Sequence, residues 1–153
     1  VEEYVFVRKA LEGETVRRLA LDTPDGLVAA LDDNLEAQRK AVADDDRVKF
    51  HKLDLHYHEI LVSALDYKRV KSMVDTARYN LDRARRITNS MRRIAVGIEE
   101  HVGIVDAIRA GNPEAATQRM HAHLDSMVRE LYALANKRPE LFIDGELAPW
   151  VSE

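Results

Sequence analysis

Apolar residues recur along most of this chain at the three- and four-residue spacing of amphipathic α-helices. The clearest stripe runs through Phe50, Leu53, Tyr57, Ile60, Leu61 and Ala64. Comparable stripes predict helices over residues 2–21, about 24–43, 47–65, 70–86, 97–110 and 113–135. Most gaps between these helices are short. Helices joined in this way indicate an all-α fold, an antiparallel bundle of about six to seven helices.

Helix-capping residues place several of the predicted ends. Thr23 followed by Pro24 predicts the start of the second helix, and Asn112 followed by Pro113 predicts the start of the sixth. The acidic run at 44–46 suits the start of the third, where the helix dipole favours negative charge. Residues 88–90 predict a break, followed by a poorly defined stretch to about Val96. The tail from Lys137 carries Pro139, Pro149 and Trp150, which we expect to be loosely attached or packed against a partner.

Composition narrows the functional classes. The 153 residues fit one domain, and the absence of cysteine excludes disulfides, thiolate metal sites and cysteine nucleophiles and favours a cytoplasmic location. No apolar run approaches the roughly 20 residues that span a bilayer, and no signal peptide opens the chain. The net charge of −4 gives no general attraction for nucleic-acid phosphate.

Four polar residues fall inside the apolar stripes: Asp54, His58, His101 and His123. Asp54 and His58 lie one turn apart on the same helical face. Of the other three histidines, the spacing predicts that His56 and His121 face water, whereas the position of His51 is ambiguous.

One inward histidine alone is more often a hydrogen-bonded core residue than a metal ligand. Several unpartnered polar groups in one core would cost a few kcal/mol each, and a single divalent ion would satisfy Asp54, His58, His101 and His123 together. Such a set of three nitrogens and one oxygen suits zinc, nickel, manganese, iron or copper.

The same residues carry a family pattern. Residues 8–12 (RKALE) match an opening motif of Arg, two variable residues, Leu and Glu, and residues 54–58 (DLHYH) match Asp-x-x-aromatic-His. Residues 100–108 (EHVGIVDAI) match Glu-His-x-x-Ile-x-x-Ala-Ile, and residues 120–124 (MHAHL) match Met-x-x-His-Leu. In these motifs the chain resembles the C-terminal ligand-binding domain (FCD) of FadR-type regulators in the GntR family of transcription factors.

The resemblance implies that residues 1–153 form an effector-binding and dimerisation domain, and that the family's N-terminal winged-helix domain, which binds DNA, is absent from this chain. It implies a divalent metal, zinc or nickel ahead of manganese or iron, held by Asp54, His58, His101 and His123. A small organic acid would bind at that metal, and the homodimer would transmit its binding to DNA through the missing domain. Tyr67 stands where the family often has asparagine, a difference that could reshape the pocket wall.

Two arginines are candidate contacts for the carboxylate of such an effector. Arg78 and Arg85 lie at the border of the apolar stripe of the fourth helix, where a guanidinium can bind a carboxylate through two parallel hydrogen bonds. Arg8 is a further candidate, with a structural ion pair to Glu12, four residues on, as its alternative.

Two other functions compete with a sensor. A helical-bundle metallohydrolase could use three histidines and an aspartate to activate water, but Glu59 and Glu100, the acids nearest the ligands in sequence, are rotated off the inner face, and no His-Glu-x-x-His motif is present. A plain interaction bundle with structural histidines is the third possibility, and metal analysis separates it from the other two.

Overall fold

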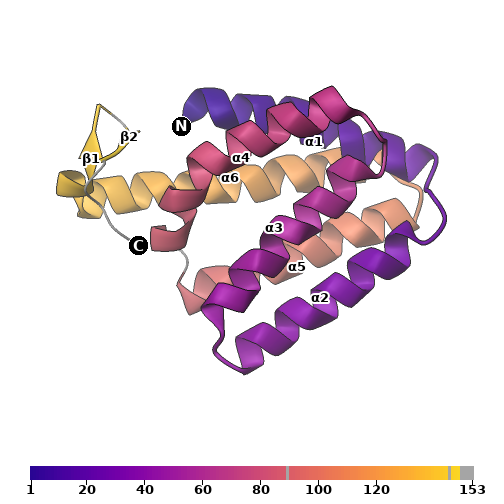
Figure 1. The fold of residues 1–153 in the computed structure, drawn as a ribbon, viewed down its shortest axis with the longest axis horizontal. Coiled ribbons are helices and arrows are strands. Elements are labelled where there is room, and N and C mark those ends of the chain that lie inside the picture. The colour runs from indigo at the N-terminus through magenta and orange to yellow at the C-terminus, as the bar shows by residue number, and fades with distance from the viewer. Residues whose placement is uncertain (89, 145, 149–153) are drawn as a thin grey trace.

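The computed structural model describes residues 1–88, 90–144 and 146–148. Six α-helices account for most of them (Figure 1). They are α1 (Glu2–Leu21), α2 (Leu27–Ala43), α3 (Arg47–Ser63), α4 (Lys68–Thr88), α5 (Met91–Arg109) and α6 (Pro113–Lys137). The predicted all-α bundle is therefore confirmed. None of the helices in the described ranges is long and apolar enough to cross a membrane.

The helices form two groups of three. Helices α2, α3 and α5 pack together on one side, and α1, α4 and α6 on the other (Figure 1). The main core lies between the groups, where α1 and α6 contact α5 and α1 and α4 contact α3. Fully buried members of this core include Val16, Leu31, Tyr57, Ile104 and Met120. Elements from both groups thus meet around the middle of α3 and α5.

The predicted acidic start of α3 and the predicted cap of α6 are confirmed. The carboxylate of Asp46 accepts a hydrogen bond from the backbone N–H of Lys49 at 2.9 Å. Asn112 caps α6 by accepting from the N–H of Ala115 at 3.0 Å, with Pro113 in the first turn. Each cap satisfies an N–H group that has no partner within its helix.

Two predicted helix starts are wrong. Thr23 does not cap α2, because its hydroxyl donates to the carbonyl of Leu19 at 2.7 Å, and α2 begins only after Gly26 in the left-handed region at φ 79°. Helix α5 begins at Met91 rather than near Gly97. There Ser90 accepts from the N–H of Arg93 at 3.2 Å, which supplies a cap.

The C-terminal segment holds small elements that the sequence did not predict. Helix α6 ends at Lys137, two residues later than expected, and a 3₁₀ turn, η1 (Pro139–Leu141), follows. The strands β1 (Phe142–Ile143) and β2 (Glu146–Leu147) then pair antiparallel. The expectations for Pro149 and Trp150 lie outside the described residues.

Candidate metal centre

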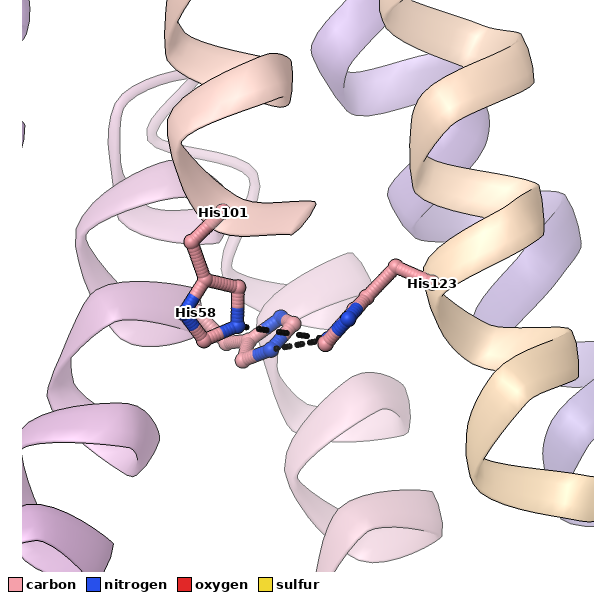
Figure 2. Close-up of side chains that lie close together, drawn as sticks. All are labelled: His58, His101 and His123. Carbon is pink, nitrogen blue, oxygen red and sulfur yellow. Dashed lines mark hydrogen bonds between the residues drawn. The ribbon is translucent and has the colours of Figure 1, made fainter. Parts of the chain in front are cut away.

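Three histidines from three helices converge inside the bundle. His58 on α3, His101 on α5 and His123 on α6 point their rings toward a common centre (Figure 2). Nε2 of His123 lies 3.3 Å from Nε2 of His101 and 3.3 Å from Nε2 of His58. His58 and His101 are fully buried, and His123 is 5% exposed. The prediction that these three side chains face inward is confirmed.

Each ring is held from behind by an acceptor on another helix. Nδ1 of His58 is 2.7 Å from Oε1 of Glu12, and Nδ1 of His123 is 2.7 Å from Oε2 of Glu100. Nδ1 of His101 is 3.1 Å from Oε1 of Gln38, whose amide nitrogen donates to Asn34. Ionised carboxylates and a carbonyl-type oxygen can only accept, which favours the tautomer with the proton of each ring on Nδ1.

This arrangement leaves three Nε2 lone pairs facing one another. In this tautomer neither nitrogen of the two 3.3 Å contacts, drawn as dashed lines in Figure 2, has a proton to donate. A cation between them removes the repulsion. Tetrahedral coordination by imidazole at about 2.0–2.1 Å places ligand nitrogens about 3.3 Å apart, so the observed spacing fits one first-row divalent ion. Acceptors of this kind behind the rings are those that orient histidine ligands in metal proteins.

Asp54 lies beside the cluster but is shared with an arginine. Its Oδ1 is 3.4 Å from Nε2 of His101, and its Oδ2 accepts from Arg85 at 2.6 Å. Burial alone would raise the pKa of Asp54, but Arg85 and the three imidazoles hold it well below its ordinary value. Asp54 is therefore an anion, with one oxygen toward the histidines.

The pKa values keep the imidazoles of the cluster available as ligands. Burial lowers the pKa of His58 to about 3, against the opposing effect of Glu12. Burial, with His123 next in effect, holds the pKa of His101 well below its ordinary value. Both rings are neutral at physiological pH, the form that binds metal. For Glu100, hydrogen bonds from His123 and Arg93 overcome the effect of burial and lower the pKa to about 2.

Arginines surround the exposed side of the cluster. Arg8, Arg85 and Arg93 line a cavity of about 20 Å³ next to His123. Arg8 is 1% exposed and donates from Nε to Glu12 at 2.6 Å, which confirms the predicted i,i+4 ion pair. Arg93 donates to both carboxylate oxygens of Glu100, at 3.1 and 2.7 Å. The cavity thus combines an imidazole with three guanidinium groups and Glu130, and each of the three arginines is paired with a carboxylate of its own.

The two predicted effector contacts on α4 are placed differently. Arg85 lines the cavity beside His123, whereas Arg78 donates to the carbonyl of Leu55 at 2.6 Å and lines a separate groove with Glu59, Lys71 and Asp75. A third cavity, of about 320 Å³, lies between α3 and the first turn of α5. Its walls include Val48, Phe50, His51 and Ile94.

The remaining histidines are only partly as expected. His56 is exposed, as predicted. The expectation for His121 is wrong: its ring is half-buried between α6 and α1, with Nε2 3.0 Å from the carbonyl oxygen of Lys9. His51, which the pattern left ambiguous, is buried, with Nε2 2.7 Å from Oδ1 of Asp82.

Sequence reasoning did not identify the partners of the histidines. Gln38 lies in the apolar stripe of α2, and Glu12 precedes Val16 by one turn on α1. The signal in the sequence that could have identified these partners is a polar residue at an inward position of an apolar stripe. Glu100 gave a weaker one, because it lies next to His101 and is only half-buried.

Comparisons with known proteins agree with the resemblance. A family model described as the FCD domain matches residues 3–126. An uncharacterised HTH-type transcriptional regulator of Streptomyces ambofaciens is 30% identical over 143 residues, which cover 93% of this chain and 60% of that protein. The HTH-type transcriptional repressor RspR of Escherichia coli K12 is 22% identical over 90% of this chain and 60% of its own length. The HTH-type transcriptional repressor NanR of Citrobacter rodentium is 27% identical over 141 residues, which cover 90% of this chain and 53% of that protein. The chain thus spans between half and two thirds of these relatives.

Proposed function

The chain belongs to the FCD domain family of GntR-type transcriptional regulators, and we propose that it is a metal-dependent sensor of small organic acids. His58, His101 and His123 bind one divalent ion through Nε2. Asp54 supplies an oxygen from Oδ1. Zinc or nickel suits this donor set better than manganese or iron, because imidazole nitrogen dominates it.

One observation carries the proposal: three Nε2 atoms face each other while every Nδ1 lies within hydrogen-bond distance of an acceptor oxygen. If the histidines only filled space in the core, nothing would require their Nε2 atoms to face one another. An acceptor at each Nδ1 favours the tautomer whose Nε2 lone pair points inward, which is the form of histidine that binds metal.

The charge around the cavity supports an acid as effector. A bound divalent ion would add positive charge to a cavity whose lining already holds three arginines, each paired with one carboxylate, beside Glu130. A carboxylate would complete the coordination of such an ion and could accept a charge-assisted hydrogen bond from a neighbouring guanidinium group. Arg78 faces the neighbouring groove and holds α4 against α3 through Leu55, so we assign it a supporting role.

Regulation needs the rest of a longer protein. In this proposal residues 1–153 are the effector domain, they pair as a homodimer, and a winged-helix domain outside this chain binds DNA. The acid changes DNA binding only to the extent that it binds one dimer geometry more tightly than the other.

Metal binding is tested with a matched pair of histidine variants. His58→Ala removes a proposed ligand, and His56→Ala removes an exposed histidine on the same helix. The domain is stripped with chelator, reloaded with Zn²⁺ or Ni²⁺, and analysed by mass spectrometry and calorimetry. We expect about one ion per chain in the wild type and in His56→Ala, and a loss of affinity in His58→Ala. Equal binding by both variants would refute the assigned site.

Acid sensing is tested by titrating the metal-loaded and metal-free domain with lactate, malate and citrate. We expect heat of binding only in the loaded form, and weaker binding in Arg85→Gln. Acid binding that is independent of metal would place the effector elsewhere.

A hydrolase is supported less well. A metal-bound water would need a general base within hydrogen-bond reach. Glu100 is engaged by His123 and Arg93, and Glu59 is an exposed residue beside His56 and Lys71. The relatives are named as transcriptional regulators and repressors.

A further inference from the structure

Gly97 occupies an unusual place in the middle of α5. It is buried, yet a Cβ built on it would meet nothing within 4 Å. Its backbone has ordinary helical geometry, so no turn requires glycine. A glycine inside a helix destabilises it by about 0.5–1 kcal/mol relative to alanine. Packing and backbone conformation therefore give no reason for glycine here.

The neighbours of Gly97 belong to the candidate site. Arg93 and His101 lie one turn before and one turn after it on the same face of α5, and Glu100 borders that face. Cβ bonds tilt toward the N-terminus of a helix, so the open space lies toward Arg93 and Ile94. Arg93 lines the small cavity beside His123, and Ile94 lines the 320 Å³ cavity. Gly97 itself is in neither lining, but it follows one lining residue of each cavity by about one helical turn.

The space matters because the cavity beside His123 is small. Its volume of about 20 Å³ holds roughly one water-sized group. That is room for one end of a ligand, not for the carbon skeleton of an organic acid. One turn from Arg93 along α5, a Cβ on Gly97 would meet no atom within 4 Å, so this position has open space.

We propose that the space over Gly97 receives the carbon skeleton of the acid whose carboxylate binds the metal, and that Gly97 sets the largest acid the domain accepts. This inference rests on the proposed function, since it assumes an acid at the metal. It adds a residue that determines specificity without touching the metal. The ligand class is a hydroxy- or polycarboxylate too large for the small cavity alone.

The test compares two glycine-to-alanine variants in one helix. Gly97→Ala adds a methyl group to the open space, whereas Gly103→Ala adds one where the nearest atom is Nη1 of Arg119, 3.3 Å away. Each variant is loaded with Zn²⁺ and titrated with acetate and citrate, and zinc affinity is measured by chelator competition. Thermal unfolding without acid reports on the helix itself.

We expect Gly97→Ala to weaken citrate binding by about tenfold or more, the usual effect of one misplaced methyl group in a pocket. Acetate and zinc binding change less than about twofold, and the melting temperature without acid is unchanged or higher, because alanine favours the helix. Gly103→Ala leaves citrate binding as in the wild type. Equal citrate binding by both variants would overturn the role of Gly97 and leave the sensor intact. A wild type that binds zinc but neither acid would overturn the sensor and this inference with it.

Discussion

At the scale of single residues, Glu100 joins the two parts of the candidate site. One carboxylate accepts from Nδ1 of His123 and from the guanidinium of Arg93, which lines the anion cavity. It thereby fixes the tautomer of a proposed ligand and the position of a proposed anion contact. Residues behind a metal ligand of this kind affect affinity although they never touch the ion.

Glu100→Gln should lower metal affinity by about 10- to 100-fold, the range typical for partners of metal-bound histidine. The amide keeps a similar shape but loses the negative charge that holds the proton on Nδ1 of His123. Chelator competition with Zn²⁺ measures the change. Glu99→Gln is the matched control, because Glu99 is exposed on the same helix. Identical affinities in the two variants would contradict the role given to Glu100.

Burial of His58 and His101 predicts how stability depends on pH in the metal-free domain. The unfolded chain takes up a proton on His58 below about pH 6.5, whereas the folded form does so only near pH 3. Between these values the unfolded state binds more protons, so the free energy of unfolding falls as the pH decreases. Urea unfolding in EDTA at pH 7.5, 6.5 and 5.5 should show this fall. His58→Gln should flatten it, and an unchanged slope in that variant would refute the assignment.

The inward direction of the site residues could be predicted, but their partners could not. A 3.6-residue period separates inner from outer positions, which is enough to place His58, His101 and His123. Contacts between helices depend on the crossing angles and rotamers that bring two faces together. These decided that Arg85, and not Arg78, lies beside Asp54.

At the scale of elements, the crossing of α1 and α6 depends on a glycine. A Cβ at Gly13 would lie 2.4 Å from Nε2 and 3.0 Å from Cδ2 of His121. The imidazole fills the place of that side chain and reaches the carbonyl of Lys9. The two helices therefore approach closely only because one position lacks a side chain.

Gly13→Ala should destabilise the domain by about 1–3 kcal/mol, as expected for overpacking of a close contact. Urea unfolding of the metal-free protein gives the value. The double variant Gly13→Ala/His121→Ala tests the cause. Because the ring is then gone, the double variant should be destabilised by less than the sum of the two single variants. Additive effects of the two changes would show that the clash with His121 is not the reason.

The start of α3 offers a second test. Asp46→Ala removes the cap to Lys49 and should cost about 1 kcal/mol of unfolding free energy. Asp44→Ala removes only an exposed contact with Lys40 and should change stability by less than about 0.5 kcal/mol. Similar losses in both variants would mean that general negative charge, rather than the cap, stabilises this end.

Long periodic stripes were predicted well, and the ends of helices less so. The bounds of α1 follow from its stripe alone, whereas the first turn of α5 was missed because Ile94 is its one buried side chain. Threonine before proline suggested a cap at Thr23, but its hydroxyl finds the carbonyl of Leu19 instead. Local hydrogen bonds of this kind compete with capping, and a sequence does not reveal which of them forms.

At the scale of the whole molecule, the candidate site connects all six helices. The three histidines come from α3, α5 and α6, their partners Glu12 and Gln38 from α1 and α2, and Arg85 brings in α4 through Asp54. In the sequence these groups are up to 111 positions apart, the separation of Glu12 and His123. An ion at the centre would therefore link helices that lie far apart in the sequence.

Metal should consequently stabilise the fold as a whole. If the native state binds the ion and the unfolded chain does not, stability rises by about 2.7 kcal/mol when free metal is 100 times the dissociation constant. Thermal unfolding with Zn²⁺ and with EDTA should differ accordingly in the wild type and in His56→Ala. In His101→Ala the difference should vanish, because one of the three converging nitrogens is lost. A melting temperature that is the same with metal and with chelator would favour a plain helical bundle, in which the buried imidazoles are merely structural.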